Sequence, residues 1–230
     1  MNRIDLYGDD KGFVELVDHM GTDLTIVNSA RVSFGKHKES LDAQDKKLIN
    51  YLVEHKHTST FEHNLVTFRV KVPLFVRSQH HRHRTWSYNE ISRRYTDFNI
   101  EFYEPGAFRK QSKSNRQASD IDSSFNPYMP TDSLDTLASY RVRDHHKKSL
   151  ELYNKLMESG VCREQARGVL PQNMYTEYYG TVNLNNLLKF VSLRIHEGAQ
   201  WEIQELAQGM LKIAEGLWPI AVKAFREKEN

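Results

Sequence analysis

One amphipathic helix constrains the fold of this chain more than any other sequence pattern. Between residues 199 and 217, apolar side chains recur at helical spacing, as Ile203, Leu206 and Met210 show, which predicts a long helix with one apolar face. Such a face is stable only when another layer of structure covers it. The positions expected on its outer face are Glu202, Glu205, Gln208 and Lys212. The pattern therefore predicts a layered core.

Strand patterns supply the expected second layer. Residues 65–72 and 174–182 are rich in β-branched and aromatic side chains, and residues 98–103 alternate apolar with polar positions. Further helices are expected over 39–54, over 137–157, and from Pro73 towards Arg84. Helices and strands follow one another without a regular strand-helix-strand repeat. The predicted fold class is therefore α+β, with a mixed or antiparallel sheet and packed helices.

Length and composition favour one globular domain. The chain has 230 residues and a formal net charge of +2. Its length suffices for one sizeable core, so we expect a single domain over 1–230. No apolar run approaches the length of a membrane span, and the first residues lack the apolar stretch of a secretory signal. Cys162 is the only cysteine, so an intramolecular disulfide is impossible. We expect a cytoplasmic protein that does not enter a membrane.

One segment departs from these patterns. Residues 107–135 are rich in serine, aspartate, asparagine and lysine and contain Pro127 and Pro130. A polar stretch of this length without periodicity is typical of a surface loop. We expect a mobile insertion loop over this range.

The segment from Arg77 to Arg94 concentrates positive charge. It holds five arginines, one glutamate and no lysine, which gives a local formal charge of +4 against +2 for the whole chain. A guanidinium presents a rigid fork of donors that suits phosphate, whereas lysine serves a merely basic surface equally well. The contrast predicts a localised anion site, most simply for a phosphorylated small molecule. A loop over 87–94 is expected to fold beside the helix that carries the first arginines.

Three of the arginines outside this segment have similar surroundings. Arg31, Arg167 and Arg194 each stand near small residues or apolar periodicity. A single arginine in such a place usually extends past the core to solvent or pairs with a carboxylate. Together, the three predict that several segments converge on one anion.

Other chemistries fit the sequence less well. Six histidines lie between residues 55 and 83, but no HExxH motif accompanies them and the nearby arginines oppose a cation, so no metal site is predicted. No GxGxxG motif is present, which argues against a dinucleotide-binding fold. Cys162, at an expected helix start, is either a reactive thiol or a small capping residue. A nucleotide- or RNA-binding module without turnover stays open, although 32 basic and 30 acidic residues do not favour a nucleic acid polymer.

The arginine segment also carries a family resemblance. Arg82-His83-Arg84, followed by seven residues and then Ser92, resembles the RHR-x7-S motif of the flavin-dependent thymidylate synthases. The resemblance extends over residues 12–104 and 159–217. Other matching segments occur in the expected order: 29–34, 61–63, 89–90, 170–171, 181–183 and 199–204.

This resemblance implies a methyltransferase that forms a homotetramer, with active sites at the subunit interfaces. The family reduces FAD with NADPH, takes its carbon from methylene-tetrahydrofolate and converts dUMP to dTMP. Folate-only thymidylate synthases instead use a cysteine preceded by proline, and valine precedes Cys162. The implied partners are small molecules, with no nucleic acid polymer among them.

The resemblance also implies site residues by matched position. Arg194 is the implied catalytic residue. The implied FAD contacts are Ser59, Arg82, His83, Arg84, Glu90, Asn183, Leu184, Asn185 and Lys189. The implied dUMP contacts are Gln79, His80, His81, Arg82, Glu90, Ile91, Ser92, Arg93, Arg94, Arg167 and Arg194.

Overall fold

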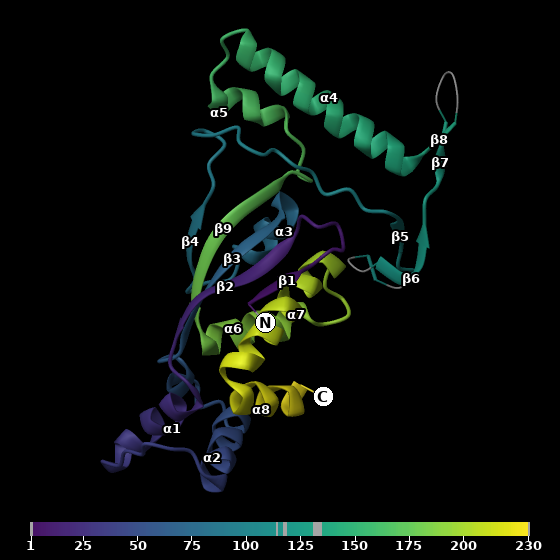
Figure 1. The fold of residues 1–230 in the computed structure, drawn as a ribbon. Coiled ribbons are helices and arrows are strands. Elements are labelled where there is room, and N and C mark those ends of the chain that lie inside the picture. Colours follow the sequence, from purple (N-terminus) through teal and green to yellow (C-terminus); the bar gives the residue numbers. More distant parts are fainter. Residues whose placement is uncertain (1, 114, 117–118, 131–134, 230) are drawn as a thin grey trace. The chain divides into compact units, whose positions relative to one another are not determined.

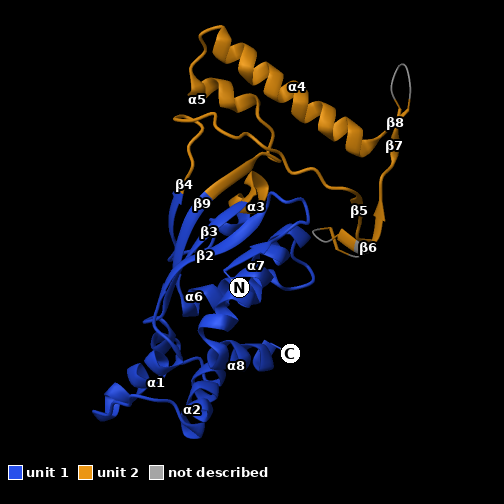
Figure 2. Cartoon of the chain, viewed as in Figure 1, with its two compact units in different colours: residues 1–71, 79–89, 178–230 blue, residues 72–78, 90–177 orange. Residues whose placement is uncertain are grey.

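The computed structural model describes residues 2–113, 115–116, 119–130 and 135–229 (Figure 1). By its internal contacts the chain divides into two compact units (Figure 2). Unit 1 holds residues 1–71, 79–89 and 178–230, and unit 2 holds residues 72–78 and 90–177. The single domain expected over 1–230 stays a prediction.

Unit 1 is built on a five-stranded sheet. In spatial order its strands are β1 (Arg3–Asp5), β2 (Phe13–Met20), β3 (Leu65–Pro73), β9 (Tyr175–Asn183) and β4 (Ser87–Glu90). β2 pairs antiparallel with both β1 and β3. Val66, Phe68 and Val70 of β3 are fully buried, because alternate side chains of a strand point to the same face. The strands predicted over 65–72 and 174–182 are confirmed, and so is the α+β class.

Three helices follow β9 in the sequence: α6 (Leu184–Arg194), α7 (Trp201–Leu217) and α8 (Pro219–Glu229). Helix α7 packs against β1, β2, α6 and α8. Its residues Ile203, Leu206 and Met210 are fully buried, as predicted. Glu202 was expected on the outer face but is 3% exposed, because the first turn of α7 lies beside Tyr7, whose hydroxyl donates to the Glu202 carbonyl at 3.1 Å.

Helix α1 (Asp23–Arg31) is tied to α8 by a buried carboxylate. Asp23 accepts hydrogen bonds from the backbone N–H groups of Ile220 and Ala221, both at 3.0 Å. These donors belong to the first turn of α8, where the helix leaves its N–H groups without helical partners. Burial raises the pKa of Asp23, and the two backbone bonds oppose that rise. The carboxylate thereby fixes where α8 begins.

Helix α2 (Ala43–Glu54) confirms the helix expected over 39–54, with a later start. Asp42 caps it by accepting from the N–H groups of Gln44 and Asp45 at 2.8 and 3.0 Å. Between α1 and α2 lies a short 3-10 helix, η1 (Val32–Phe34), and after α2 lies a second, η2 (Thr58–Phe61). Helix η2 packs against α1, α2 and α6.

Unit 2 contains the helix α4 (Ala138–Glu158), which confirms the helix expected over 137–157. The short helices α5 (Arg163–Ala166) and η3 (Arg167–Val169) pack against it. Cys162 is exposed and stands immediately before α5. The single turn of α5 is too short to provide the dipole of a long helix.

The expectation of a structureless loop over 107–135 is wrong for much of that range. Strands β5 (Phe108–Gln111) and β6 (Ser119–Phe125) pair antiparallel, and β7 (Tyr128–Met129) pairs with β8 (Thr136–Leu137). Backbone hydrogen bonds hold these hairpins without an alternating apolar pattern in the sequence. Residues 114, 117–118 and 131–134 lie outside the described part of the chain, so the expected mobility there stays a prediction.

Two further predictions are wrong. The strand expected over 98–103 is reduced to an isolated bridge between Phe102 and Met174. The side chain of Arg93 bonds the carbonyls of Phe98 and Asn99, which removes two acceptors that a strand would need. Asn99 also has a φ of 51°, a left-handed conformation that interrupts a strand.

The helix expected from Pro73 to Arg84 is shorter than predicted. Pro73 closes β3, and α3 runs only over Leu74–His80. The chain then turns, and Thr85 takes a φ of 68°. Residues 87–90 were expected in a loop but form β4, the sheet neighbour of β9. The helix that was expected to carry the first arginines therefore holds Arg77 but not Arg84.

Candidate functional site

A cavity of about 650 Å³ lies within unit 2. Five of the residues predicted to bind the nucleotide line it: Glu90, Ile91, Ser92, Arg93 and Arg167. The segment 90–93 follows strand β4, whereas Arg167 begins η3, so two distant parts of the sequence meet here. Arg94 also belongs to unit 2, and the remaining predicted nucleotide contacts belong to unit 1.

Glu90 is the most constrained side chain of this cavity. Arg77 Nε donates to Glu90 Oε1 at 3.0 Å and to Oε2 at 2.9 Å, and Arg77 Nη2 donates to Oε2 at 2.5 Å. The hydroxyl of Thr176 donates to Oε1 at 2.6 Å. In this ion pair, the Arg77 side chain is 33% exposed and the Glu90 side chain is 19% exposed. Three elements, α3, β4 and β9, thus fix one carboxylate.

The three arginines of unit 2 that were predicted to bind the nucleotide differ in how much of each guanidinium remains available. Arg93 is buried, and its terminal nitrogens donate to the carbonyls of Phe98 at 2.6 Å and Asn99 at 3.3 Å. Burial lowers the pKa of Arg93. Arg94 forms an exposed ion pair with Glu164 at 3.4 Å. Arg167 is exposed and forms no ion pair with a described residue, so it offers the cavity an open guanidinium.

In unit 1, the predicted catalytic residue Arg194 meets His83. Arg194 Nε donates to His83 Nε2 at 3.0 Å. Burial, followed by the charge of Arg194, lowers the pKa of His83 to about 4. The ring is therefore neutral at pH 7, with its proton on Nδ1, because Nε2 is an acceptor. Burial also lowers the pKa of Arg194, and its terminal nitrogens remain available to a ligand.

The side chain of His80 belongs to the core of unit 1. It is fully buried, its Nδ1 lies 2.7 Å from the Tyr178 hydroxyl, and its ring packs against Trp86 at 4.4 Å. Burial lowers its pKa well below the ordinary value, and the charges of its neighbours add to the effect. A Cβ on Gly180 would meet the Trp86 ring at 3.3 Å, so this position favours glycine. A contact of His80 with a nucleotide would therefore run through the backbone.

The residues predicted for FAD surround the start of α6 and the turn after α3. Asn183 caps α6 by accepting from Asn186 N at 2.9 Å, and Asn185 donates to Glu62 at 2.9 Å. Arg82 and Arg84 are exposed, and neither forms an ion pair within the described ranges. Two unpaired guanidinium groups suit the diphosphate of a flavin dinucleotide. The other predicted flavin residues in unit 1 are Ser59 and Lys189, both exposed, and Leu184, which is buried.

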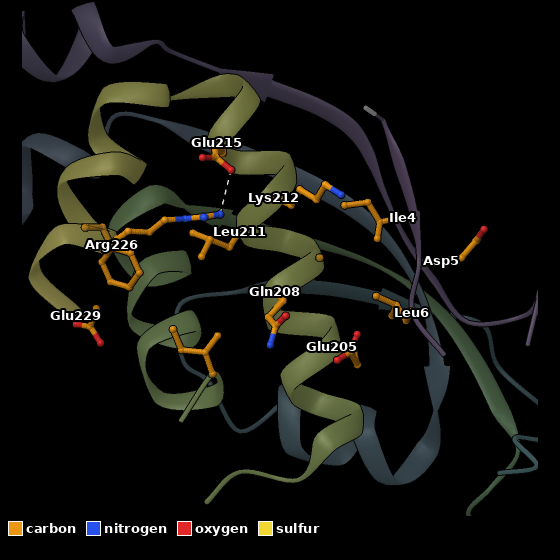
Figure 3. A pocket seen from close by; sticks show the side chains of 13 residues that line it. Ile4, Asp5, Leu6, Glu205, Gln208, Leu211, Lys212, Glu215, Arg226 and Glu229 are labelled. Atoms are coloured by element: carbon orange, nitrogen blue, oxygen red, sulfur yellow. Dashed lines mark hydrogen bonds and ion pairs between the residues drawn. The ribbon is translucent and has the colours of Figure 1, made fainter. Parts of the chain in front are cut away.

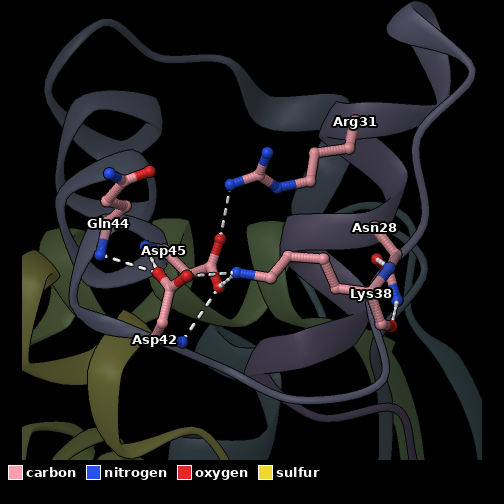
Figure 4. A network of polar contacts seen from close by, with 6 residues as sticks. All are labelled: Asn28, Arg31, Lys38, Asp42, Gln44 and Asp45. Carbon is pink, nitrogen blue, oxygen red and sulfur yellow. Dashed lines mark hydrogen bonds and ion pairs between the residues drawn. The ribbon is translucent and has the colours of Figure 1, made fainter.

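Gln79 and Arg31 have partners that their sequence neighbourhoods did not suggest. Gln79 Nε2 donates to Gln200 Oε1 at 2.6 Å. Arg31 pairs with Asp45, which also accepts from Lys38 (Figure 4). Asp45 therefore balances the charge of Arg31, and the predicted convergence of the three arginines on one anion stays a prediction.

A second cavity, of about 740 Å³, lies in unit 1 along β1, α7 and α8 (Figure 3). Asp5, Glu205, Glu215 and Glu229 line it, together with the two cations Lys212 and Arg226. Burial raises the pKa of Glu205. An excess of carboxylates opposes a phosphorylated ligand, and the lining includes none of the predicted site residues.

The sequence missed the two residues that hold Glu90 in place. Thr176 is 86 positions from Glu90, and Arg77 was counted only as part of the positive charge. Neither pairing leaves a local signal, because both depend on how the strands are arranged. Among the described residues, no group of three or more histidine, cysteine or acidic side chains is placed to hold a metal ion. Within the same residues, no helix is both long and apolar enough to cross a bilayer.

Comparisons with known proteins extend over most of the chain. The model of a family described as "Thymidylate synthase complementing protein" matches residues 15–220. A flavin-dependent thymidylate synthase of Thermus thermophilus is 46% identical over 218 residues, which cover 95% of this chain and 77% of the relative. One of the same name from Kosmotoga olearia is 42% identical, with 94% and 90% covered. The structure of a UMP/dUMP methylase, PolB of Streptomyces cacaoi, bound with 5-Br dUMP, aligns with a TM-score of 0.80 and 35% identity over 97% of each chain.

Proposed function

Because the chain belongs to the family of thymidylate synthase complementing proteins, we propose that it is a flavin-dependent thymidylate synthase that reductively methylates dUMP to dTMP. Membership of this family makes the chain an enzyme, a methyltransferase. The proposed carbon donor is methylene-tetrahydrofolate and the proposed reductant is NADPH. Both rest on the resemblance in the sequence, as does the cytoplasmic location.

The observation that carries the proposal is the cavity in unit 2. Its volume of about 650 Å³ suits a small phosphorylated ligand. We assign the phosphate of dUMP to Arg167, whose guanidinium has no ion-pair partner in the described part of the chain. Ser92 accepts from the Arg94 N–H at 3.3 Å, which leaves its hydroxyl hydrogen for a phosphate oxygen. A fork of guanidinium donors and a hydroxyl together suit a phosphate monoester.

We assign the catalytic role to Arg194. Uracil is a poor nucleophile, and loss of its imide proton shifts electron density towards the carbon that is methylated. A guanidinium fixed at that edge stabilises the developing negative charge. His83 Nε2 accepts a hydrogen bond from Arg194 Nε, so the terminal nitrogens of Arg194 are left for the pyrimidine.

The flavin contacts stay a proposal that the chemistry of unit 1 supports. Arg82 and Arg84 would hold the diphosphate, and the segment 183–185 would contact the cofactor at the start of α6. FAD, when bound, supplies hydride transfer. The side chains around it have the task of orienting the substrate and excluding water.

We also propose a homotetramer with active sites at subunit interfaces. In unit 1, Val32 and Phe34 of η1 are 70% and 79% exposed. Two large apolar side chains exposed so close together are typical of a surface that another chain covers. Size-exclusion chromatography with light scattering tests this assembly directly.

The function is tested with purified protein. We expect flavin absorbance near one FAD per subunit, and NADPH-dependent dTMP formation when methylene-tetrahydrofolate and dUMP are supplied. Arg194→Ala should abolish dTMP formation while the oligomer and its flavin remain. Colourless protein that binds no added FAD contradicts the proposal, and so does an Arg194→Ala variant with normal turnover.

A further inference from the structure

We propose that Arg77 and Thr176 are positioning residues, which hold the Glu90 carboxylate as a fixed hydrogen-bond acceptor for the nucleotide in the unit 2 cavity. This inference rests on the proposed function, because it takes dUMP as the occupant. Neither residue is among those that the sequence resemblance assigned to a ligand. Both line the same cavity as Glu90.

The geometry of the contacts fixes both the place and the plane of the carboxylate. Arg77 Nε donates to both oxygens of Glu90, and Nη2 donates to Oε2, so the guanidinium and the carboxylate form a bidentate pair. The Thr176 hydroxyl adds a bond to Oε1 from the neighbouring strand. A carboxylate held by hydrogen bonds from two separate elements cannot rotate without breaking one of them.

The same contacts leave Glu90 with capacity for a ligand. A carboxylate offers roughly four acceptor positions. Arg77 and Thr176 use three donor hydrogens, one of them shared between the two oxygens. Glu90 is 19% exposed at the cavity, so its remaining acceptor position is accessible. The 3′-hydroxyl of dUMP is a donor of the required kind.

The burial of Thr176 supports a role beyond filling space. Thr176 is 4% exposed, and its hydroxyl donates to Glu90. A buried hydroxyl that loses its partner costs free energy, so threonine here depends on the carboxylate. Valine has nearly the same shape without the hydroxyl, so Thr176→Val removes this one donor, whereas Thr176→Ser keeps it.

A matched control exists in the same sheet. The Thr67 hydroxyl of β3 lies 2.9 Å from the Thr181 hydroxyl of β9, a side chain–side chain contact that does not involve Glu90. Thr67 is not among the residues that line the unit 2 cavity. Thr67→Val therefore removes one half-buried hydroxyl without touching the proposed acceptor.

The experiment measures dUMP binding to the FAD-loaded protein by calorimetry, with the melting temperature of each variant recorded. We expect Thr176→Val to weaken dUMP binding by about 5- to 10-fold, since one hydrogen bond is lost and the carboxylate loosens. Thr176→Ser should bind within about 2-fold of the unaltered protein and Thr67→Val likewise. Arg77→Lys, which keeps the charge but loses the fork, should weaken binding at least as much as Thr176→Val. In turnover assays the loss should fall on KM, with kcat little changed.

A double variant separates positioning from a general packing effect. If Thr176 acts through Glu90, then Thr176→Val should have no further effect on dUMP binding once Glu90→Gln is present. An equal loss in both backgrounds overturns the proposal, as does a Thr176→Val protein that binds dUMP normally. If the unaltered, flavin-loaded protein binds no dUMP, the proposed function falls and this inference falls with it.

Discussion

Two carboxylates of this protein are each held by an arginine, and they differ in what remains open around them. Asp45, in unit 1, is fully buried, and it accepts from Arg31 at 2.6 Å and from Lys38 at 2.5 Å (Figure 4). Glu90, in unit 2, is held as firmly by Arg77, yet it keeps 19% of its side chain exposed and lines a cavity.

The difference shows that an arginine–carboxylate pair is not by itself a sign of function. Asp45 faces two cations and also accepts from the backbone N–H of Asp42 at 3.0 Å, and its side chain is fully buried, so no ligand can reach its oxygens. Glu90 has one cation and one hydroxyl as partners. The two carboxylates therefore differ in exposure to a cavity, which Glu90 has and Asp45 lacks.

The largest expected effect is on folding stability at Asp45. Asp45→Asn leaves Arg31 and Lys38, which are only 24% and 26% exposed, without their shared anion. We expect the free energy of unfolding to fall by about 3 kcal/mol, because removing one partner of a buried ion pair leaves charge uncompensated. Urea denaturation measures the loss. A decrease below about 1 kcal/mol would show that Asp45 is no more critical than a surface residue.

A substitution at Glu90 should lower the affinity for dUMP more than it lowers folding stability. For Glu90→Gln we expect dUMP binding to weaken by about 10- to 30-fold, because a neutral amide is a poorer acceptor than a carboxylate held by Arg77. Calorimetry with the flavin-loaded protein measures this affinity. Asp45→Asn protein, assayed under conditions where it is folded, should bind dUMP normally. If it does not, the two regions are not functionally separate.

Acid should act selectively on the Asp45 network. Burial raises the pKa of Asp45, but the hydrogen bonds from Lys38 and Arg31 outweigh it and lower the pKa to about 2. A carboxyl whose pKa is lower in the folded state contributes stability above its unfolded pKa, and that stability is lost as the pH falls from about 4 through about 2. We expect the free energy of unfolding of the unaltered protein to fall over this pH range towards that of Asp45→Asn, because protonation removes the same charge. The difference in unfolding free energy between the unaltered protein and Asp45→Asn, followed from pH 6 to about pH 2, isolates this contribution; a difference that does not change with pH contradicts it.

The smallest effect should follow from removing one of the two cations around Asp45. Lys38→Met leaves Arg31 in place, so the buried carboxylate keeps a charged partner. We expect the melting temperature to fall by about 2 °C or less. Differential scanning calorimetry measures the change. A decrease as large as that of Asp45→Asn would mean that Lys38 alone neutralises the carboxylate.

Regular elements could be predicted where the sequence pattern is local. The strand β3 alternates buried and partly exposed side chains along Leu65–Pro73, and α7 carries its apolar face at helical spacing, so each was predictable within a few residues. The hairpin of β5 and β6 was not, because Ser119–Phe125 is mostly polar and its pairing comes from backbone bonds. The end of α3 at His80 was also missed, because no glycine or proline between residues 81 and 84 marks it in the sequence.

The sequence indicated which residues belong to the candidate site, but it did not indicate what each of their side chains contacts. The arginine segment and Ser92 indicated an anion site, and the structure brings Ser92 and Arg167 to one cavity. Sequence could not show that Arg93 would donate to backbone carbonyls, or that His80 would lie in the core. Those outcomes depend on which groups lie nearby after folding, and residue type alone does not specify them.

The capping of α8 by Asp23 has a consequence for the synthesis of this protein. The carboxylate and its two backbone donors are 197 and 198 positions apart in the sequence. A growing chain exposes Asp23 long before the ribosome has made the turn that receives it, and closure over such a separation is slow. Helices α1 and α2 therefore lack the covering helix α8 until translation reaches it. During this interval the nascent chain is open to binding by chaperones and to aggregation.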